Sequence, residues 1–467
     1  MPFNSWTFLV FFGCVFVLHR VMPTWTLRKR VLLLASYVFY AAWNPPYVLI
    51  LLFSTTFDWW LARRIWRTTD QRRRRLLLLS SLICNLGLLG FFKYGSFLLE
   101  NFQSLLSLTG VAYHAPQDTI VLPIGISFYT FASLSYTIDV YRREIDADQP
   151  WLDYALFVSF FPHLVAGPIV RARVLLPQIA QPRQASADQL GWGLTLVIAG
   201  LFCKVVLADN IFAPVVDAVY LAPDKANALD AWLAVFGFSA QIYYDFNGYS
   251  LCAIGLALCF GFAFPDNFRH PYAARSFSDF WRRWHISLST WLRDYLYIPL
   301  GGSRHGAART CASLMLTMLI GGLWHGASWM FVLWGGLHGT YLVLERQLRP
   351  RFASMPAPEW LTALLVFVVV SLTWVPFRAP SLEAMSHFVA AFLRLGAEPR
   401  VDLMPATLCL LGVAATLRWH HWLRDRSLEE GFGQFANLAQ TTAIGFCLVA
   451  MYLYGGGEQR AFIYFQF

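Results

Sequence analysis

Apolar residues recur along this chain in long runs, and short polar stretches separate them from one end of the sequence to the other. A helix needs about 20 predominantly apolar residues to cross a bilayer, and runs near this length are typical of membrane spans. The pattern predicts helices over residues 5–22, 30–44, 46–65, 75–96, 119–141, 151–171, 190–208, 227–262, 309–323, 327–347, 359–378, 402–418 and 437–455. Because 227–262 exceeds one crossing, we expect a long tilted helix or two pieces there.

Composition supports a membrane protein. Hydrophobic residues make up 57% of the 467 residues and charged residues only 13%, whereas about a quarter of a soluble protein is charged. We therefore predict an all-α polytopic protein, a bundle of about 11–13 membrane helices with interfacial or re-entrant helices between them. No soluble domain or linker interrupts the pattern. We expect one membrane domain over 1–467, with N-terminal spans in 1–118, a core in 119–347 and C-terminal spans in 348–467.

Basic residues give the chain a net charge of +9. They lie in short loops between apolar runs, where they set topology and meet anionic lipid headgroups rather than nucleic acid. The densest block includes Arg63, Arg64 and Arg67 and continues at 72–75. The positive-inside rule places that loop in the cytoplasm. Counting back, the loop at 28–30 is also cytoplasmic, and the N-terminus faces the outside, which we expect to be the periplasm.

Several ionisable residues fall inside the expected spans, where charged groups are costly and usually line a cavity or pair with one another. For each of them a paired structural role is the first interpretation. Together they predict a polar cavity inside the bundle. These residues are Asp58, Asp139, His163, Lys204, Asp209 and Asp245.

The stretch 276–300 differs from the spans. Ser276, with Asp279 three residues later, predicts a helix start. Aromatic and aliphatic residues then fall on one helical face and charged residues on the other, with His285 at the edge. Such a basic, tryptophan-rich amphipathic helix lies in the membrane interface or re-enters it. Pro299 and the following glycines end it, and the surrounding arginines favour the cytoplasmic side.

His325 lies in an apolar, glycine-rich segment, 321–329. The small residues around it allow a neighbouring helix or a thin substrate to approach closely. Imidazole suits proton abstraction near neutral pH, so His285 and His325 together could activate a hydroxyl toward an acyl donor. A packing role for His325 is the alternative. His338 lies about 220° around the same helix by periodicity and should point elsewhere. His163, between two prolines, is expected to be structural or channel-lining.

The motifs around these histidines resemble those of membrane-bound O-acyltransferases. Residues 280–289 and 291–302 are similar to the family signature, and 322–326 resembles its active-site histidine motif. Residues 123–131, 162–168 and 245–250 match the bacterial branch, and 462–467 is similar to the ending of alginate O-acetyltransferases. The resemblance covers essentially the whole chain, in order.

The resemblance implies an enzyme that passes acetyl groups from a cytoplasmic thioester, acetyl-CoA, across the inner membrane through a central tunnel. It implies O-acetylation of an exopolysaccharide, alginate or cellulose, with periplasmic acetyltransferases and export machinery as partners. His325 would be catalytic and His285 its companion. The implied donor-binding residues are Arg282, Arg283, Trp284, Arg293, Asp294, Asn247 and Trp324. A thioester donor needs no metal or other tightly bound cofactor, and no metal-ligand spacing occurs.

Two alternatives remain open at this point. One is D-alanyl transfer to teichoic acid, in which a carrier-protein thioester is the donor. The other is a transporter or channel whose intramembrane histidines relay protons or line a pore.

Overall fold

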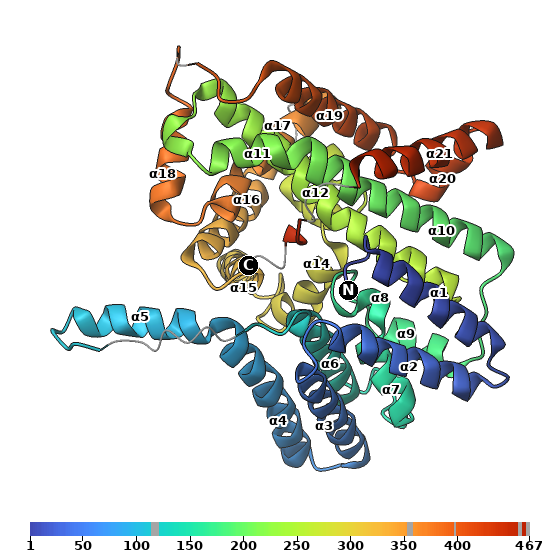
Figure 1. The fold of residues 1–467 in the computed structure, drawn as a ribbon. Coiled ribbons are helices and arrows are strands. Elements are labelled where there is room, and N and C mark those ends of the chain that lie inside the picture. Colours follow the sequence, from blue (N-terminus) through green and yellow to red (C-terminus); the bar gives the residue numbers. More distant parts are fainter. Residues whose placement is uncertain (114–120, 353–357, 397, 456–459, 464–467) are drawn as a thin grey trace. The chain divides into compact units, whose positions relative to one another are not determined.

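The computed structural model describes residues 1–113, 121–352, 358–396, 398–455 and 460–463 (Figure 1). Every regular element in these ranges is a helix, which confirms the all-α class. Within this part of the chain, four helical segments are long and apolar enough to cross a membrane: Gln71–Ser107, Ala187–Tyr220, Gly306–His325 and Glu359–Arg378. The protein is therefore a polytopic membrane protein, and the expected total of about 11–13 spans stays a prediction.

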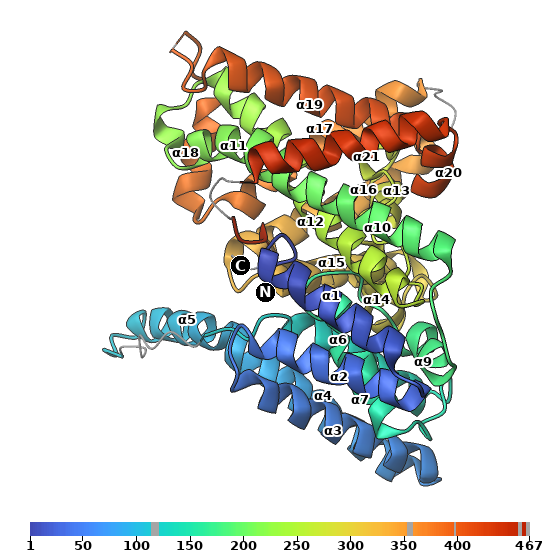
Figure 2. The same ribbon diagram turned by 45° about the vertical axis from the view of Figure 1, so that its right-hand side comes forward.

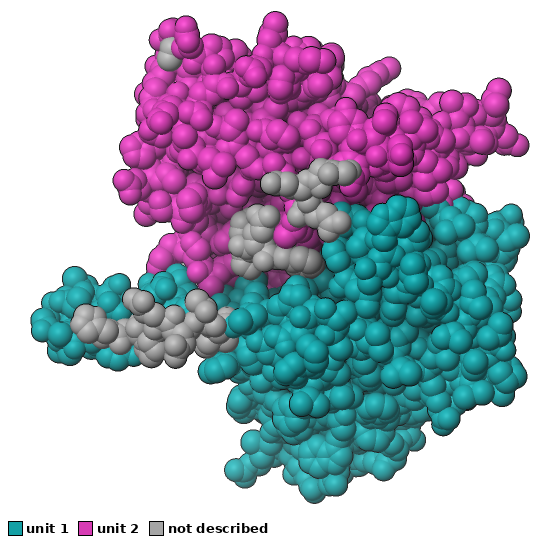
Figure 3. Space-filling model, in the orientation of Figure 1, with its two compact units in different colours: residues 1–194, 253–265 teal, residues 195–252, 266–467 magenta. Residues whose placement is uncertain are grey.

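The chain forms two compact units (Figure 3). Unit 1 comprises 1–194 and 253–265, and unit 2 comprises 195–252 and 266–467. This division by packing does not test the expectation of one membrane domain, which stays a prediction.

Unit 1 contains the first helices of the chain. Within it α3, α4 and α6 pack against one another, and α2 packs against α7 (Figures 1 and 2). The helices are α1 (Trp6–Val21), α2 (Trp25–Ala41), α3 (Tyr47–Arg67), α4 (Gln71–Leu89), α5 (Gly95–Ser107), α6 (Ile126–Tyr141), α7 (Trp151–Ser159), α8 (Phe161–Leu164), α9 (Ala172–Ala180) and the first half of α10 (Ala187–Phe202). The expected span over 151–171 is broken at Phe160, between α7 and α8.

Unit 2 holds the remaining helices. Within it α16 packs against α15, α17 and α13. The helices are α11 (Ala213–Tyr220), most of α12 (Ala228–Cys259), α13 (Phe277–Arg283), α14 (Ile286–Leu292), α15 (Gly306–His325), α16 (Trp329–Phe352), α17 (Glu359–Arg378), α18 (Leu382–Ala391), α19 (Leu403–Trp422), α20 (Leu428–Gly433) and α21 (Asn437–Tyr454). The long run at 227–262 is one helix, α12.

Large apolar side chains are exposed along several helices, where a soluble protein would carry charge. On α4 these include Leu76, Leu79, Ile83 and Leu86, each about one helical turn from the next. Contiguous exposed apolar surface of this kind marks contact with a membrane or a partner. On a helix of membrane length, we assign it to lipid.

Most of the ionisable residues inside the expected spans are paired. Asp58 accepts hydrogen bonds from Ser81 Oγ at 2.6 Å and Asn85 Nδ2 at 2.8 Å. Lys204 Nζ lies 2.8 Å from Asp209 Oδ1 and also pairs with Asp245. His163 Nε2 lies 3.1 Å from the carbonyl oxygen of Phe157. Pairing satisfies these groups without water, as burial at depth requires, and confirms the structural interpretation for these residues.

Candidate active site

The predicted helix over 276–300 is broken into three pieces, so the expectation of one continuous amphipathic helix was wrong. It begins where predicted, because Ser276 Oγ accepts a hydrogen bond from the backbone N–H of Asp279 at 3.0 Å. α13 then ends at Arg283, α14 follows, and a π-helical turn covers Arg293–Tyr297. The break lies at His285, whose φ of 42° is in the left-handed region that side-chain-bearing residues rarely adopt. Periodicity predicted the faces of this segment but not its break.

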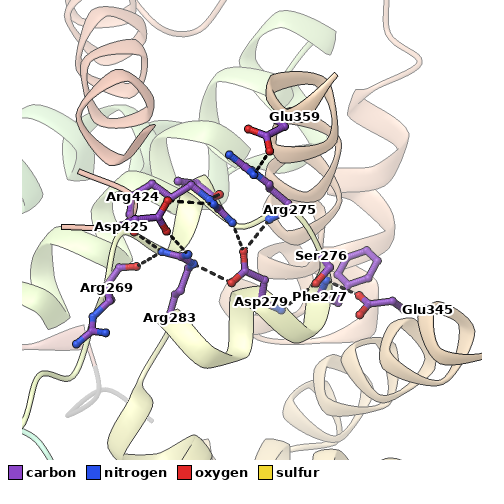
Figure 4. A network of polar contacts seen from close by, with 11 residues as sticks. Arg269, Arg275, Ser276, Phe277, Asp279, Arg283, Glu345, Glu359, Arg424 and Asp425 are labelled. Atoms are coloured by element: carbon purple, nitrogen blue, oxygen red, sulfur yellow. Dashed lines mark hydrogen bonds and ion pairs between the residues drawn. The ribbon is translucent and has the colours of Figure 1, made fainter. Parts of the chain in front are cut away.

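A polar network holds α13 in place (Figure 4). Asp279 accepts hydrogen bonds from Arg283 Nε at 2.9 Å and Arg424 Nη2 at 3.0 Å. Glu345 of α16 accepts the backbone N–H of Phe277 at 2.6 Å, and Arg275 pairs with Glu359 at the start of α17. Charge-assisted hydrogen bonds are among the stronger polar contacts in proteins, so α13 is tied to α16, α17 and the end of α19.

The same contacts set the ionisation of Asp279. Burial alone would raise its pKa, but the hydrogen bonds from Arg283 and the Arg275 backbone N–H and the nearby guanidinium charges outweigh burial and hold the pKa below its usual value. The carboxylate is therefore charged at neutral pH, as the network requires.

Asn267 fixes the orientation of His285. Its Oδ1 lies 3.1 Å from His285 Nδ1 and accepts hydrogen bonds from Ser287 Oγ at 2.8 Å and the Ser287 backbone N–H at 3.4 Å. Its Nδ2 donates to Ser250 Oγ at 3.0 Å. Since a backbone N–H can only donate, the amide oxygen must face His285, and this assigns the proton to Nδ1.

The other ring nitrogen of His285, Nε2, is therefore a bare lone pair. It is buried and has no hydrogen-bond partner among the residues that the structure describes. His285 lies between α12 and α15, outside the spanning helices, and burial lowers its pKa to about 3. The imidazole is neutral at pH 7, with an open acceptor directed away from Asn267.

Trp324 brings the two histidines together. Its ring centroid lies 6.0 Å from that of His285 and 5.0 Å from that of His325. The imidazoles are therefore no farther apart than the sum of these separations. Trp334 and Phe377 pack against His325 with centroids 5.0 and 5.4 Å away. An aromatic wall surrounds the His325 ring, which is 3% exposed.

Glycines allow the helix carrying His325 to approach its neighbour. A Cβ atom at Gly322 would lie 2.3 Å from the carbonyl oxygen of Phe331 and 3.0 Å from the Cα of Gly335. No side chain fits there, so the backbones of α15 and α16 touch, as the small residues predicted.

His325 is the last residue of α15, and α16 begins at Trp329. The expectation that His338 shares a helix with His325 and points elsewhere was therefore wrong. His338 packs against the same Trp334 ring, with centroids 4.8 Å apart, and its Nε2 lies 3.0 Å from Thr373 Oγ1. The chain reverses direction at the break over 326–328. A helical period counted across such a break assigns the wrong direction to every side chain after it.

A cavity of about 510 Å³ opens among α13, α14, α15 and α16, and we call it the α13–α16 cavity. It is lined by Ser278, Trp281, Ser289, Leu292, Arg293, Tyr297, Leu314, Thr317, Met318, Leu342, Glu345 and Arg346. Trp281 connects it with the histidines, because its ring lies 5.8 Å from Trp334, which packs on His325. Ligand sites have this size and this mixture of apolar wall and few polar groups.

Of the predicted donor-binding residues, the structure places some at the histidines or the α13–α16 cavity and others away from both. Trp324 packs on both histidines. Arg293 lines the α13–α16 cavity, and its Nε donates to Asp294 Oδ1 at 2.7 Å. Trp284 is buried against Trp374, with centroids 5.1 Å apart. The other three do not line the cavity. Arg283 belongs to the polar network, and Asn247 Nδ2 donates to the Tyr243 hydroxyl on the same helix, α12, at 3.3 Å. Arg282 is exposed and makes no polar contact with the described residues. The roles of all nine site residues stay predictions.

Sequence reasoning missed Asn267, Glu345 and Arg346. Asn267 lies in an irregular stretch before α13, where no periodicity relates it to His285. Glu345 and Arg346 fall near the end of the expected span 327–347, and no motif or periodicity relates them to a site. Only the fold brings these residues to the histidines and the cavity.

The sequence is similar to known proteins over most of its length. Residues 37–379 match the model of the membrane-bound O-acyltransferase family. A protein of Azotobacter vinelandii named probable alginate O-acetylase AlgI is 42% identical over 89% of this chain and 83% of its own length. The peptidoglycan O-acetyltransferase of Helicobacter pylori is 38% identical over 79% and 74%, and the teichoic acid D-alanyltransferase of Bacillus subtilis is 25% identical over 55% and 67%.

The matched family region contains both histidines, the aromatic wall and the α13–α16 cavity. Of the ending at 462–467, residues 464–467 lie outside the described ranges. The chain belongs to the membrane-bound O-acyltransferase family, and it is an acyltransferase.

Proposed function

We propose that this protein is an O-acetyltransferase that moves acetyl groups from acetyl-CoA across the inner membrane for O-acetylation of an exopolysaccharide such as alginate or cellulose. The names of its relatives support an acetyl group, since five alginate-type relatives are 38% or more identical to this chain. The observation that carries the proposal is that two buried imidazoles contact the same Trp324 ring, and that His325 is linked through Trp334 and Trp281 to a cavity large enough for a thioester arm.

The α13–α16 cavity suits such a donor. Its aliphatic and aromatic wall would accept the apolar arm of the thioester, and Arg293 and Arg346 would meet the phosphates. Arginine forms bidentate hydrogen bonds with phosphate, so the two arginines would hold the phosphate groups at the entrance of an otherwise apolar cavity.

His325 would act as the general base. It would take the proton of the acceptor hydroxyl while that oxygen forms a bond to the acetyl carbonyl carbon. The carbon–sulfur bond then breaks, and the imidazolium returns the proton to the departing thiolate. His285, neutral and with Nε2 open, would serve as the companion group on the donor side.

The remaining assignments follow from the sequence and the resemblance. We propose an inner-membrane location with the N-terminus in the periplasm, because the arginine-rich loops favour the cytoplasm. Periplasmic acetyltransferases and polymer-export machinery would be the partners. D-alanyl transfer has weaker support, since that relative shares 25% identity over about half of the chain. A non-enzymatic transporter is not proposed, because the family is one of acyltransferases.

The variant His325→Ala tests the proposal, with the exposed His421→Ala as matched control. We expect both to reach the membrane at normal levels, and only His325→Ala to leave the extracellular polymer unacetylated. Purified protein with labelled acetyl-CoA tests the donor. Full polymer acetylation by His325→Ala would refute the catalytic assignment, and indifference to acetyl-CoA would favour a carrier-protein donor.

A further inference from the structure

A short segment that follows the last helix, α21, is buried inside unit 2. We call it the 460–463 segment. Phe462 is 0% exposed and Ile463 is 6% exposed, and Ile463 belongs to a hydrophobic core cluster of that unit. Segments outside the long helices usually run over the surface of a protein. The burial of this one therefore calls for a reason, and its contacts supply one.

Two polar contacts tie the 460–463 segment to the helices of unit 2. The backbone N–H of Ile463 donates to Asp245 Oδ2 at 2.9 Å, and Arg460 pairs with Asp217. Asp245 lies on α12, is 1% exposed and also pairs with Lys204. A buried carboxylate is stable only when its oxygens have partners. The segment therefore supplies one of the hydrogen bonds that Asp245 requires.

Aromatic rings connect the same segment with the candidate active site. The ring of Phe462 lies against α12, with its centroid 4.5 Å from that of Tyr249 and 5.6 Å from that of Phe246. Phe246 is 0% exposed and packs edge-on against His285, with centroids 4.6 Å apart and ring planes at 85°. One ring, that of Phe246, therefore connects Phe462 with the imidazole.

The His285 ring depends on support of this kind. Its backbone lies at the break between α13 and α14, so no helix fixes its direction. Asn267 holds one edge of the ring through Nδ1, and a single hydrogen bond leaves a ring able to tilt. The edge-on contact with Phe246 restricts that tilt, because aromatic rings prefer defined relative orientations. Protein interiors are close-packed and transmit strain, so Phe246 would shift if the space that Phe462 fills were emptied.

We propose that the 460–463 segment is a positioning element of the active site: Phe462 keeps Phe246 against the imidazole of His285, and the hydrogen bond from Ile463 to Asp245 holds the same turn of α12. The inference rests on the proposed acetyl transfer. Phe462 acts through Phe246, so it is a positioning residue and not a catalytic one. The competing interpretation is that Phe462 only fills the core, and the test below separates the two.

The test compares Phe462→Leu with Phe388→Leu as the matched control. Phe388 is also 0% exposed and lies in unit 2, where it packs on Tyr220 and Phe392. Both variants lose a fully buried ring, so both should lower the thermal midpoint to a similar extent. The assay is turnover of labelled acetyl-CoA by purified full-length protein. We expect kcat to fall about 10- to 100-fold in Phe462→Leu only, because a misplacement of about 1 Å at a reactive group costs about 100-fold.

Two further readouts distinguish positioning from packing. The KM for acetyl-CoA should stay unchanged in Phe462→Leu, because neither Phe462 nor Phe246 lines the α13–α16 cavity. In a double-mutant cycle, Phe462→Leu added to Phe246→Leu should change kcat little further, since the two residues act as one unit. Phe462→Met, a change to another flexible apolar side chain, takes its place should Phe462→Leu fold poorly.

The outcomes separate this inference from the proposed function. Equal kcat per folded protein in Phe462→Leu and Phe388→Leu would overturn the positioning role. So would effects of Phe462→Leu and Phe246→Leu that multiply as two independent defects do. A wild type that turns over no acetyl-CoA and acetylates no polymer would instead contradict the proposed function, and the inference that rests on it would fall with it.

Discussion

Asn267 offers the sharpest test of how the site works, because its amide determines which nitrogen of His285 carries the proton. Asn267→Leu keeps a similar volume and removes the acceptor that holds Nδ1–H. The imidazole is then free to place its proton on Nε2 and lose the lone pair beside Trp324. We expect acetyl transfer to fall while the protein still inserts.

The magnitude follows from the contacts. Asn267 Oδ1 accepts from His285 Nδ1, Ser287 Oγ and the Ser287 backbone N–H at 2.8–3.4 Å. Removing it leaves buried donors unsatisfied, at about 1–3 kcal/mol. If that cost adds to the activation free energy of acetyl transfer, turnover decreases about 5- to 150-fold, since 1.36 kcal/mol corresponds to a tenfold change in rate. Asn267→Asp keeps an acceptor toward Nδ1–H, and a carboxylate there strengthens the imidazole as a base.

The assay is kcat for acetyl transfer by purified variants, measured between pH 5 and 9. We expect Asn267→Asp to retain most of the turnover with a pH profile displaced to higher pH, and Asn267→Leu to lose it at every pH. Ser250→Ala is the control, because it removes only the outer hydrogen bond to the amide. Equal loss in the Leu and Asp variants would refute tautomer control and leave only a packing role.

Three further predictions test the surrounding structure. Gly322→Ala should strongly reduce the yield of folded protein, because its Cβ would lie 2.3 Å from a carbonyl oxygen. Gly336→Ala should be tolerated, because the nearest atom to its Cβ would be 3.5 Å away. The yield of detergent-solubilised protein, compared between the two variants, tests this. Arg293→Ala should raise the donor KM several-fold and Arg282→Ala should not, because only Arg293 lines the cavity; unchanged KM in both would remove the phosphate role. Asp279→Asn should lower the thermal midpoint at pH 7, and the difference should shrink progressively as pH falls below about 4. A carboxylate with a lowered pKa stabilises the fold above its unfolded pKa and loses that contribution as pH falls through the folded pKa, which lies lower still. A difference of the same size at pH 7 and at pH 2 would contradict this.

The sequence predicts the helical class well because the bilayer imposes a length and an apolar composition on each span. Span borders at 5–22, 46–65 and 359–378 fall within a few residues of α1, α3 and α17. The shorter helices α5, α9, α11, α18 and α20 were not predicted. They are 6–13 residues long, well short of the roughly 20 residues of a membrane crossing, so a search for apolar runs of span length does not detect them.

The site could be predicted only in part, for a different physical reason. His285 and His325 could be selected as candidate site residues from the sequence, because an ionisable side chain in an apolar segment is usually functional. Their relation to one another depends on two backbone breaks, at His285 and at 326–328, and periodic patterns continue smoothly through both. The same limit applies to Asn267, because its partners His285, Ser287 and Ser250 are brought to it only by the fold.

The positions along α15 carry the argument one step further. Leu314, Thr317 and Met318 line the donor cavity, and His325 ends the helix seven residues after Met318, about 10 Å along its axis. Trp324 fills the level between them, packed on both imidazoles. Between the cavity and His325 lie aromatic rings, of which Trp334 contacts the cavity-lining Trp281 and Trp324 contacts both imidazoles. Trp324→Ala should then open a path for water, raising acetyl-CoA hydrolysis relative to acetyl transfer. Transfer and hydrolysis that fall together would mean that Trp324 only supports the two histidines.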